Sequence, residues 1–328
     1  MMSDELGHPE TVGDEGASKG GASAMSRRGF LRTGAAAAGA SMLAGPASRV
    51  IRGGGARIVR ANPLEGLDLE GIELPDGLTL SDDGTVVGYG DTPHLPWAPE
   101  WRKHDPNRPW PPRITPGEPC CPDSPAFGPP EDAIVLFDGS DTDMWAPNEW
   151  EIENGELVAY GDDIVTRDSF GDCQLHVEWS APDPPRGAPG DQGNSGVFMM
   201  SRYEIQILDS YNLPMYADGI AGAVYGETPP MAHPMRPPGE WNEFDILFTA
   251  PVFEDGEVLK PATLTMFFNG LLVHYNTVIH GPVSHRTIRE YEPHGAKEPL
   301  SLQEHNNPVR FRNIWIRPLD DLGDHAAV

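Results

Sequence analysis

GNSGVFMMSRYEIQILD (residues 193–209) contains the clearest strand of this chain, because its second half alternates polar and apolar side chains from Tyr203 to Leu208. Alternation with a period of two is typical of a β-strand with one buried face. Glu204 and Gln206 then point to the same side, toward solvent or into a cleft. A solvated outer face is the alternative, because most strands with one polar side simply present it to water.

The rest of the chain has the same texture from about residue 131 onward. Short apolar runs recur with glycine, proline and asparagine between them, and Asn269-Gly270 separates two of the runs as a type I′ hairpin would. No long helical periodicity competes with them. We therefore predict an all-β protein, a two-sheet sandwich of the jelly-roll kind. The predicted strands are 133–137, 156–160, 173–179, 196–200, 203–208, 243–248, 262–268, 271–275 and 309–316.

The N-terminal third differs in composition. Residues 26–32 (SRRGFLR) precede a short, weakly apolar run, which predicts a twin-arginine export signal over residues 1–47 with a long region before the arginine pair. Met25 is an alternative start. We expect a periplasmic or secreted protein without a membrane span in the mature chain.

Residues 48–130 form a Gly-, Pro- and Trp-rich extension in this prediction. Residues 93–130 contain 13 prolines together with Trp97, Trp101 and Trp110. Prolines exclude a helix or a central strand, and the tryptophans are too apolar for a free linker, so we expect an extended arm docked on the main domain. The sandwich occupies residues 131–319, and residues 320–328 are an acidic tail.

The net charge of the chain argues against two classes of binding partner. The formal net charge of −27 argues against binding nucleic acid or an anionic membrane surface, both of which require a basic face. It does not identify a substrate.

Polar side chains gather at three places. His176 and Glu178 share one face of the strand 173–179, as Glu204 and Gln206 do on theirs, and neighbouring strands would join them in one cluster. Residues 302–310 place Gln303 and His305 in a loop before the last strand, where a histidine could be a general base or a metal ligand. An ordinary polar turn is the alternative there.

Six segments carry a resemblance to a known family: 134–139 (IVLFDG), 170–179 (FGDCQLHVEW), 194–197 (NSGV), 203–209 (YEIQILD), 239–242 (GEWN) and 309–314 (VRFRNI). Together they resemble the 3-keto-disaccharide hydrolase domain family, formerly domain of unknown function 1080. The resemblance covers about residues 131–319, and it implies a concanavalin A-like lectin/glucanase jelly roll and a secreted or periplasmic enzyme. It also implies a glycoside or oligosaccharide substrate already oxidised at C3, which a sugar 3-dehydrogenase would supply.

The implied chemistry defines the groups that such a site needs. A ketone at C3 acidifies the C2 proton, so a base can remove that proton and the aglycone leaves from C1. His176 or His305 could be the base, oriented by Glu178 or Glu204. A divalent ion held by carboxylates could stabilise the enolate. Side chains suited to bind sugar hydroxyls or the oxyanion are Asn194, Arg202, Gln206, Asp209 and Gln303.

Two other functions remain open. Glu204 and Asp209 have the offsets of the outer carboxylates in retaining glucanases of this fold, although Gln206 replaces the central acid. A sugar-binding module without catalysis is the third reading, with aromatic side chains as stacking platforms.

Overall fold

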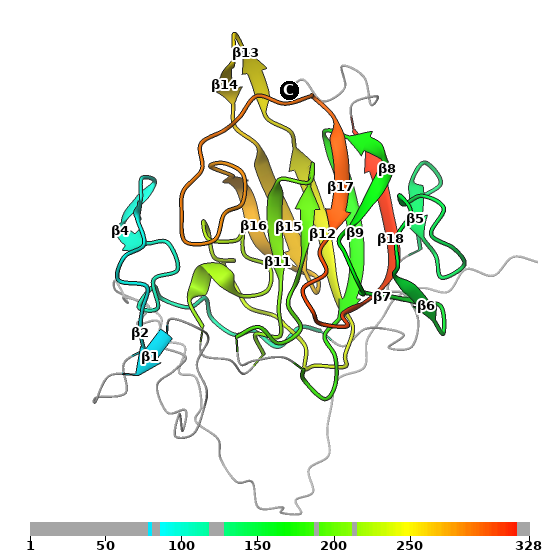
Figure 1. Ribbon diagram of the computed structural model, residues 1–328, viewed down its shortest axis with the longest axis horizontal. Coiled ribbons are helices and arrows are strands. Elements are labelled where there is room, and N and C mark those ends of the chain that lie inside the picture. The colour runs from blue at the N-terminus through cyan, green and yellow to red at the C-terminus, as the bar shows by residue number, and fades with distance from the viewer. Residues whose placement is uncertain (1–77, 81–85, 118–127, 187–189, 212–214, 320–328) are drawn as a thin grey trace, which may run out of the picture. The chain divides into compact units, whose positions relative to one another are not determined.

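The computed structural model describes residues 78–80, 86–117, 128–186, 190–211 and 215–319, all within the compact unit that runs from Arg57 to Val328. Their regular elements are β-strands and one short 3-10 helix, η1 (Ala217–Gly219). The chain is an all-β jelly-roll sandwich, as the sequence predicts, and its two main sheets are antiparallel throughout (Figure 1).

The smaller sheet contains the strand with which the sequence analysis began. Its order is β11-β10-β17-β8, and two-stranded hairpins lie beside the main sheets. The small-sheet strands are β8 (Ile164–Phe170), β10 (Ser195–Met199), β11 (Tyr203–Ile207) and β17 (Glu298–Leu302), and the hairpin strands are β1 (Leu78–Leu80), β2 (Val86–Gly88), β3 (His94–Leu95), β4 (Ala98–Arg102), β13 (Val252–Glu254) and β14 (Glu257–Lys260).

The larger sheet has the order β16-β15-β12-β9-β18-β7-β6, and β5 also pairs with β18. Its strands are β5 (Ile134–Phe137), β6 (Glu151–Glu153), β7 (Glu156–Val158), β9 (Cys173–Ser180), β12 (Asn242–Thr249), β15 (Thr263–Phe268), β16 (Leu271–Val278) and β18 (Arg310–Pro318). The predicted strands therefore all correspond to strands of the two main sheets.

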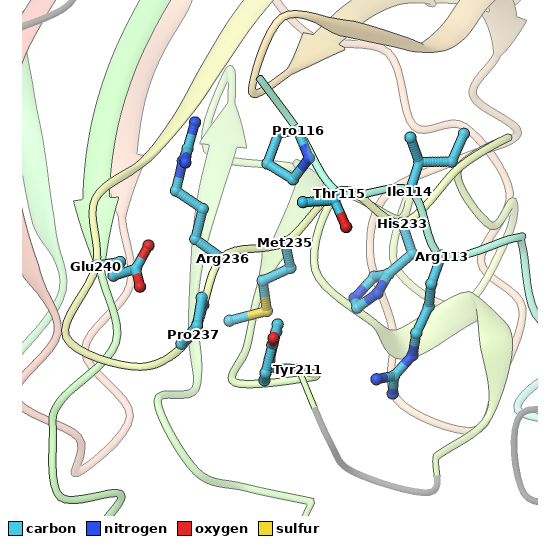
Figure 2. A pocket seen from close by; sticks show the side chains of 10 residues that line it. All are labelled: Arg113, Ile114, Thr115, Pro116, Tyr211, His233, Met235, Arg236, Pro237 and Glu240. Atoms are coloured by element: carbon cyan, nitrogen blue, oxygen red, sulfur yellow. The ribbon is translucent and has the colours of Figure 1, made fainter. Parts of the chain in front are cut away.

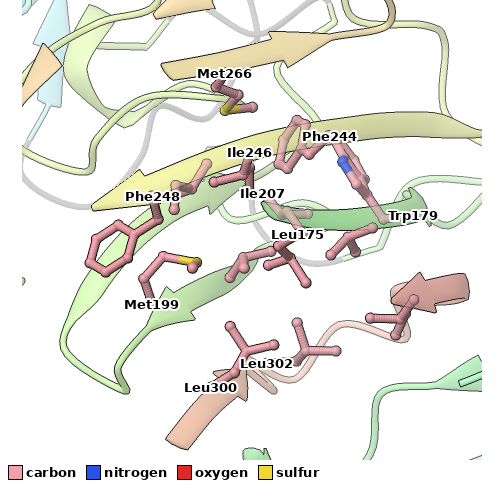
Figure 3. Packing of buried hydrophobic residues seen from close by; sticks show 14 of the residues in the cluster. Leu175, Trp179, Met199, Ile207, Phe244, Ile246, Phe248, Met266, Leu300 and Leu302 are labelled. Atoms are coloured by element: carbon pink, nitrogen blue, oxygen red, sulfur yellow. The ribbon is translucent and has the colours of Figure 1, made fainter. Parts of the chain in front are cut away.

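Apolar side chains from the facing surfaces of both sheets form one core. Figure 3 shows Leu175, Phe244 and Ile246 of the large sheet packed near Met199 and Leu302 of the small sheet. All five are at most 2% exposed. Burial of alternate residues on each strand leaves the other residues on the outer faces, which is where a site can form.

The β15–β16 hairpin confirms the turn expected from Asn269-Gly270. Both residues have positive φ, 48° and 75°, as a type I′ turn requires. The Asn269 side chain also forms hydrogen bonds with the neighbouring strand, since its Nδ2 donates to the Asn242 Oδ1 at 2.9 Å and its Oδ1 accepts from the Glu243 amide. The turn is thus joined to the start of β12.

The described part of the arm, residues 86–117, packs against the segment that contains η1. Trp110 is buried in a small apolar cluster with Tyr89 and Tyr216, and Trp97 stacks on His280 with ring centroids 3.9 Å apart. Three side chains therefore tie this proline-rich segment to the sandwich by apolar and aromatic contacts.

One expectation about the sheets is wrong. The strand with His176 and Glu178, β9, belongs to the large sheet, whereas Glu204 and Gln206 lie on β11 of the small sheet. Both pairs point away from the shared core, so they lie on opposite outer faces of the sandwich. The two polar faces cannot form one cluster.

The export signal predicted for residues 1–47 lies outside the described residues. Within the described residues, no helix is both long and apolar enough to cross a membrane.

Candidate functional site

A pocket of about 380 Å³ lies on the outer face of the small sheet. Strands β10 and β11 form its floor, the segment after β17 forms one side, and a loop near residue 284 forms another. Its lining residues are Asp163, Asn194, Phe198, Glu204, Gln206, Tyr225, Val283, Ser284, His285, Gln303 and His305.

Strand register determines which side chains reach the floor. Phe198 on β10 lies opposite Glu204 on β11, and Gly196 lies opposite Gln206. A Cβ at Gly196 would be only 2.8 Å from Glu204 Oε1, so the missing side chain leaves room for the carboxyl group. Glycine at this position therefore allows the close approach of the carboxyl to the strand.

Burial controls the protonation of Glu204, whose side chain is only 6% exposed. Burial disfavours the ionised form and raises the pKa of Glu204 to about 8, although the positive charges of His305 and Lys103 act in the opposite direction. At neutral pH this glutamate is mostly a carboxylic acid, which can donate a proton.

One amide side chain contacts the Glu204 carboxyl, and a second lies at the edge of the pocket. When the Gln206 amide is oriented so that its nitrogen faces acceptors, it donates to Glu204 Oε1 at 2.7 Å and to the Ser195 carbonyl at 3.3 Å. The Asn194 amide nitrogen donates to Asp191 Oδ1 at 2.7 Å. Gln206 thus contacts the acid on the floor of the pocket, and Asn194 contacts Asp191 at its edge.

His305 at this edge is backed by a carboxylate. Its Nδ1 lies 3.1 Å from Asp191 Oδ1, and this hydrogen bond is the main reason why the pKa of His305 is raised above its usual value of 6.5. Because a carboxylate is a strong hydrogen-bond acceptor, Asp191 favours the neutral tautomer of His305 that carries its proton on Nδ1. Nε2 is then the basic nitrogen of the ring. His305 and Asp191 therefore have the arrangement of a general base that is oriented by a carboxylate.

The opposite side of the pocket is aromatic. The Tyr225 hydroxyl lies 3.0 Å from His285 Nδ1, and the Tyr225 amide donates to the Glu204 carbonyl at 3.1 Å. Burial lowers the pKa of His285 and raises that of Tyr225, so both rings are neutral near pH 7. The wall therefore offers hydrogen bonds and flat surfaces rather than charge.

Five of the nine residues proposed from sequence line this pocket, namely Asn194, Glu204, Gln206, Gln303 and His305. Arg202 lies at the β10–β11 turn, where its carbonyl accepts a hydrogen bond from the Val283 amide, and its side chain is not part of the lining. Asp209 lies beyond the end of β11 and is also absent from it. Glu204 and Asp209 thus do not face each other across this pocket as a retaining pair would.

His176 and Glu178 instead belong to a polar cluster on the outer face of the large sheet. His176 Nδ1 lies 2.7 Å from Asp245 Oδ1, and Glu178 accepts hydrogen bonds from Arg312 and Asn313 at 2.6 and 2.8 Å. Although burial opposes the charge, the two carboxylates raise the pKa of His176 to about 9. This buried, mutually paired cluster has the character of a structural ion pair.

We expect this cluster to make stability depend on pH. The folded-state pKa of His176, about 9, exceeds the value of about 6.5 expected for an unfolded chain, so its stabilisation is complete below pH 6.5 and is lost as the pH rises through 9. The difference in unfolding free energy between the wild type and His176→Gln should shrink over this interval in urea titrations. His274→Gln is the control, because burial lowers the pKa of His274 to about 4. A constant difference for His176→Gln would contradict the assignment.

Figure 2 shows a second pocket, of about 270 Å³, between the arm and the segment after β11. Arg113 and Ile114 line it from the arm, and Tyr211, His233 and Met235 line it from the main domain. His233 contacts the Ser210 hydroxyl at 2.9 Å, and burial lowers its pKa to about 3. A histidine that stays neutral and hydrogen-bonded in this way is a poor proton acceptor, so the first pocket is the better candidate.

Sequence reasoning missed several lining residues, among them Asp163, Phe198, Tyr225 and His285. A signal existed for Phe198, because Val197 and Met199 are apolar neighbours whose burial turns Phe198 to the same face as Glu204. The other three lie outside the strands, where no periodicity predicts direction. Among the described residues, no group of three or more His, Cys, Asp or Glu side chains is arranged to hold a metal ion.

The jelly-roll sandwich and its polar, aromatic pocket fit a protein that cleaves or binds carbohydrates, and the family match gives the chain this class. Residues 132–317 match the profile of the 3-keto-alpha-glucoside-1,2-lyase-like domain, and the chain belongs to this family. The family resemblance seen in the sequence is thereby confirmed.

Two relatives agree with this assignment. A 3-keto-disaccharide hydrolase of Bacteroides thetaiotaomicron is 22% identical over 235 residues, which cover 57% of this chain and 78% of the relative. The crystal structure of a candidate glycosyl hydrolase from Parabacteroides distasonis is 39% identical, covering 65% of this chain and 93% of the other, with a TM-score of 0.58.

Proposed function

We propose that this protein cleaves the glycosidic bond of 3-keto-glycosides, including 3-keto-disaccharides, by elimination and subsequent addition of water. The observation that carries the proposal is the presence of two proton-transfer groups in one pocket: Glu204, which burial keeps protonated near pH 7, and His305, which Asp191 backs as a base. The family and the named Bacteroides relative support the substrate class.

In the first step, Nε2 of neutral His305 takes the proton from C2 of the sugar. The C2–H electron pair becomes an enolate, with negative charge on the C3 oxygen. Amide donors can stabilise this oxygen, and Gln206, Asn194 and Gln303 all line the pocket. Because these amides are neutral, they can stabilise the enolate oxygen without a second charged group being buried in the pocket.

In the second step, the enolate electrons re-form the C3 carbonyl and make a C1–C2 double bond as the C1–O bond breaks. The aglycone oxygen takes the Glu204 proton and leaves as an alcohol. Water then adds to C1 of the enone and C2 regains a proton, so the net reaction is hydrolysis. Glu204 must be protonated at the start of this step and His305 must be neutral at the start of the first step.

The substrate has to be made by another reaction, because the ketone at C3 is an oxidation product. We therefore propose that a sugar 3-dehydrogenase acts before this enzyme. Export by the twin-arginine route would place the reaction in the periplasm or outside the cell. Replacing Arg27 and Arg28 by lysine should then retain the protein in the cytoplasm in fractionation experiments.

The function is tested by mass spectrometry of the products after purified protein meets a 3-keto-glucoside or the matching plain glucoside. We expect only the keto-glycoside to be cleaved, and we expect reaction in D₂O to place deuterium at C2. Parallel reactions with EDTA test the divalent ion suggested by the chemistry. Cleavage of the plain glucoside would favour a glucanase-like mechanism, and binding of the keto-glycoside without turnover would favour a carbohydrate-binding module.

A further inference from the structure

The arm carries a buried cation close to the candidate site. Lys103 follows β4 and is 3% exposed, and burial lowers the pKa of its ammonium. A lysine is almost never buried in this way without a compensating charge nearby. The carboxyl groups of Glu227, Asp218 and Glu204 act against this effect of burial, and Asp218, whose own pKa is held below its usual value, is the group among them that stays ionised.

Packing places this ammonium directly behind the pocket wall. A Cβ at Gly226 would collide with the Lys103 Cε and Nζ, so the end of the lysine lies against the backbone between Tyr225 and Glu227. The Tyr225 amide in turn donates to the backbone carbonyl of Glu204. Only one stretch of backbone separates the ammonium from the strand of the acid.

Hydrogen bonds made by the neighbours of Lys103 connect the arm to the pocket wall. The His104 amide donates to Asp218 Oδ2 at 3.0 Å, and the Gly226 amide donates to the Asp218 carbonyl at 2.7 Å. Arg108 Nη1 donates to the Glu227 carbonyl at 2.8 Å. The arm and the wall of the pocket are therefore joined on both sides of Lys103.

We propose that Lys103 is a positioning residue for Glu204. The Lys103 ammonium supplies a positive charge behind this acid and thereby completes the site from outside the family domain. This inference rests on the proposed function for the role of Glu204. The matched family domain begins at residue 132, so the arm contributes a group that the domain itself lacks.

The charge of Lys103 affects the acidity of Glu204. The titratable groups that face Glu204 are Asp163, His305, Tyr225 and Lys103, and of these Lys103 and His305 favour its ionised form. His305 must be neutral to act as the base, which leaves Lys103 as the cation that acts on Glu204 at that stage, although burial lowers the pKa of its ammonium. It keeps Glu204 acidic enough to give its proton to an alkoxide leaving group, since an acid whose pKa rises far above the working pH transfers its proton poorly.

Carboxyl ¹³C NMR titration tests the inference without a substrate. The Glu204 resonance is identified by its loss in Glu204→Gln, and in Lys103→Met its midpoint should move above the wild-type value of about 8. Arg108→Met is the matched control, because Arg108 is also a buried arm cation but interacts with Asp218, Glu100 and Asp105 rather than Glu204. It should leave the midpoint unchanged.

A reciprocal measurement covers the case in which Lys103→Met does not fold. Coupling between two sites acts equally in both directions, so Glu204→Gln should lower the midpoint of the Lys103 ¹⁵Nζ resonance. Unchanged midpoints in a folded variant, or an equal shift in Arg108→Met, would overturn the inference. The alkaline limb of kcat/KM should move upward with the NMR midpoint, whereas NMR shifts without any turnover would reject only the proposed function.

Discussion

Glu204→Gln should lower kcat/KM on a 3-keto-glucoside by about 10²- to 10⁴-fold, the usual contribution of a positioned acid or base. Glutamine keeps the size of the side chain but cannot give a proton to the aglycone oxygen. The variant should fold normally, because glutamine removes an ionisable group from a site where burial already disfavours charge.

The pH profile separates this effect from general damage. The wild type should lose activity above about pH 8 as Glu204 ionises, and below the raised pKa of His305 as the imidazole gains a proton. Residual activity of Glu204→Gln should lack the alkaline limb. Glu243→Gln is the control, because burial also raises the pKa of Glu243 but it lies on β12 of the other sheet. Wild-type activity in Glu204→Gln would refute the assignment of the acid.

Asp218→Ala should destabilise the protein by about 3–5 kcal/mol, the range for removing one partner of a buried ion pair. Asp218 and His104 are fully buried, and Arg108 Nη1 lies 3.8 Å from Asp218 Oδ2. Although burial alone would raise it, His104 and Arg108 hold the pKa of Asp218 below its usual value. Alanine would leave the arginine buried without its carboxylate.

Urea unfolding of Asp218→Ala measures this cost. The matched control is Asp91→Ala, which removes another carboxylate that pairs with an arginine, Arg286, but at the exposed surface. Exposed pairs contribute little, so its midpoint should hardly change. Equal midpoints for the two variants would show that the Asp218 cluster does not anchor the arm. Because the pKa of Asp218 is depressed, its stabilisation should also disappear as the pH falls below about 4.

The strands could be predicted from sequence because alternation is a local property. The run Tyr203–Leu208 predicts which residues face the core, and Ile205 and Ile207 are indeed fully buried. Pairing is not local, however. Alternation predicts that His176 and Glu204 both point away from the core. A sandwich has two outer faces, however, and the pattern does not say on which of them a strand lies.

The site was predictable to the same extent. Residues on strand ends or beside them, such as Asn194 and Gln303, could be proposed from the polar pattern and lie in the pocket. Tyr225 and His285 come from loops whose course depends on tertiary contacts, among them the hydrogen bond between the two side chains. Lys103 comes from a proline-rich segment that composition describes only as a docked arm.

Because the arm packs against the η1 segment, the part of the chain that folds together is larger than the family domain of residues 132–317. A chain cut at residue 131 would keep every strand of the two main sheets but would uncover Tyr216 and Ile220, which Trp110 and Tyr89 now cover. It would also leave the Asp218 carboxylate without the His104 ring and the Arg108 guanidinium that now lie beside it. Swapping this domain between relatives should therefore succeed only when residues 86–117 travel with it.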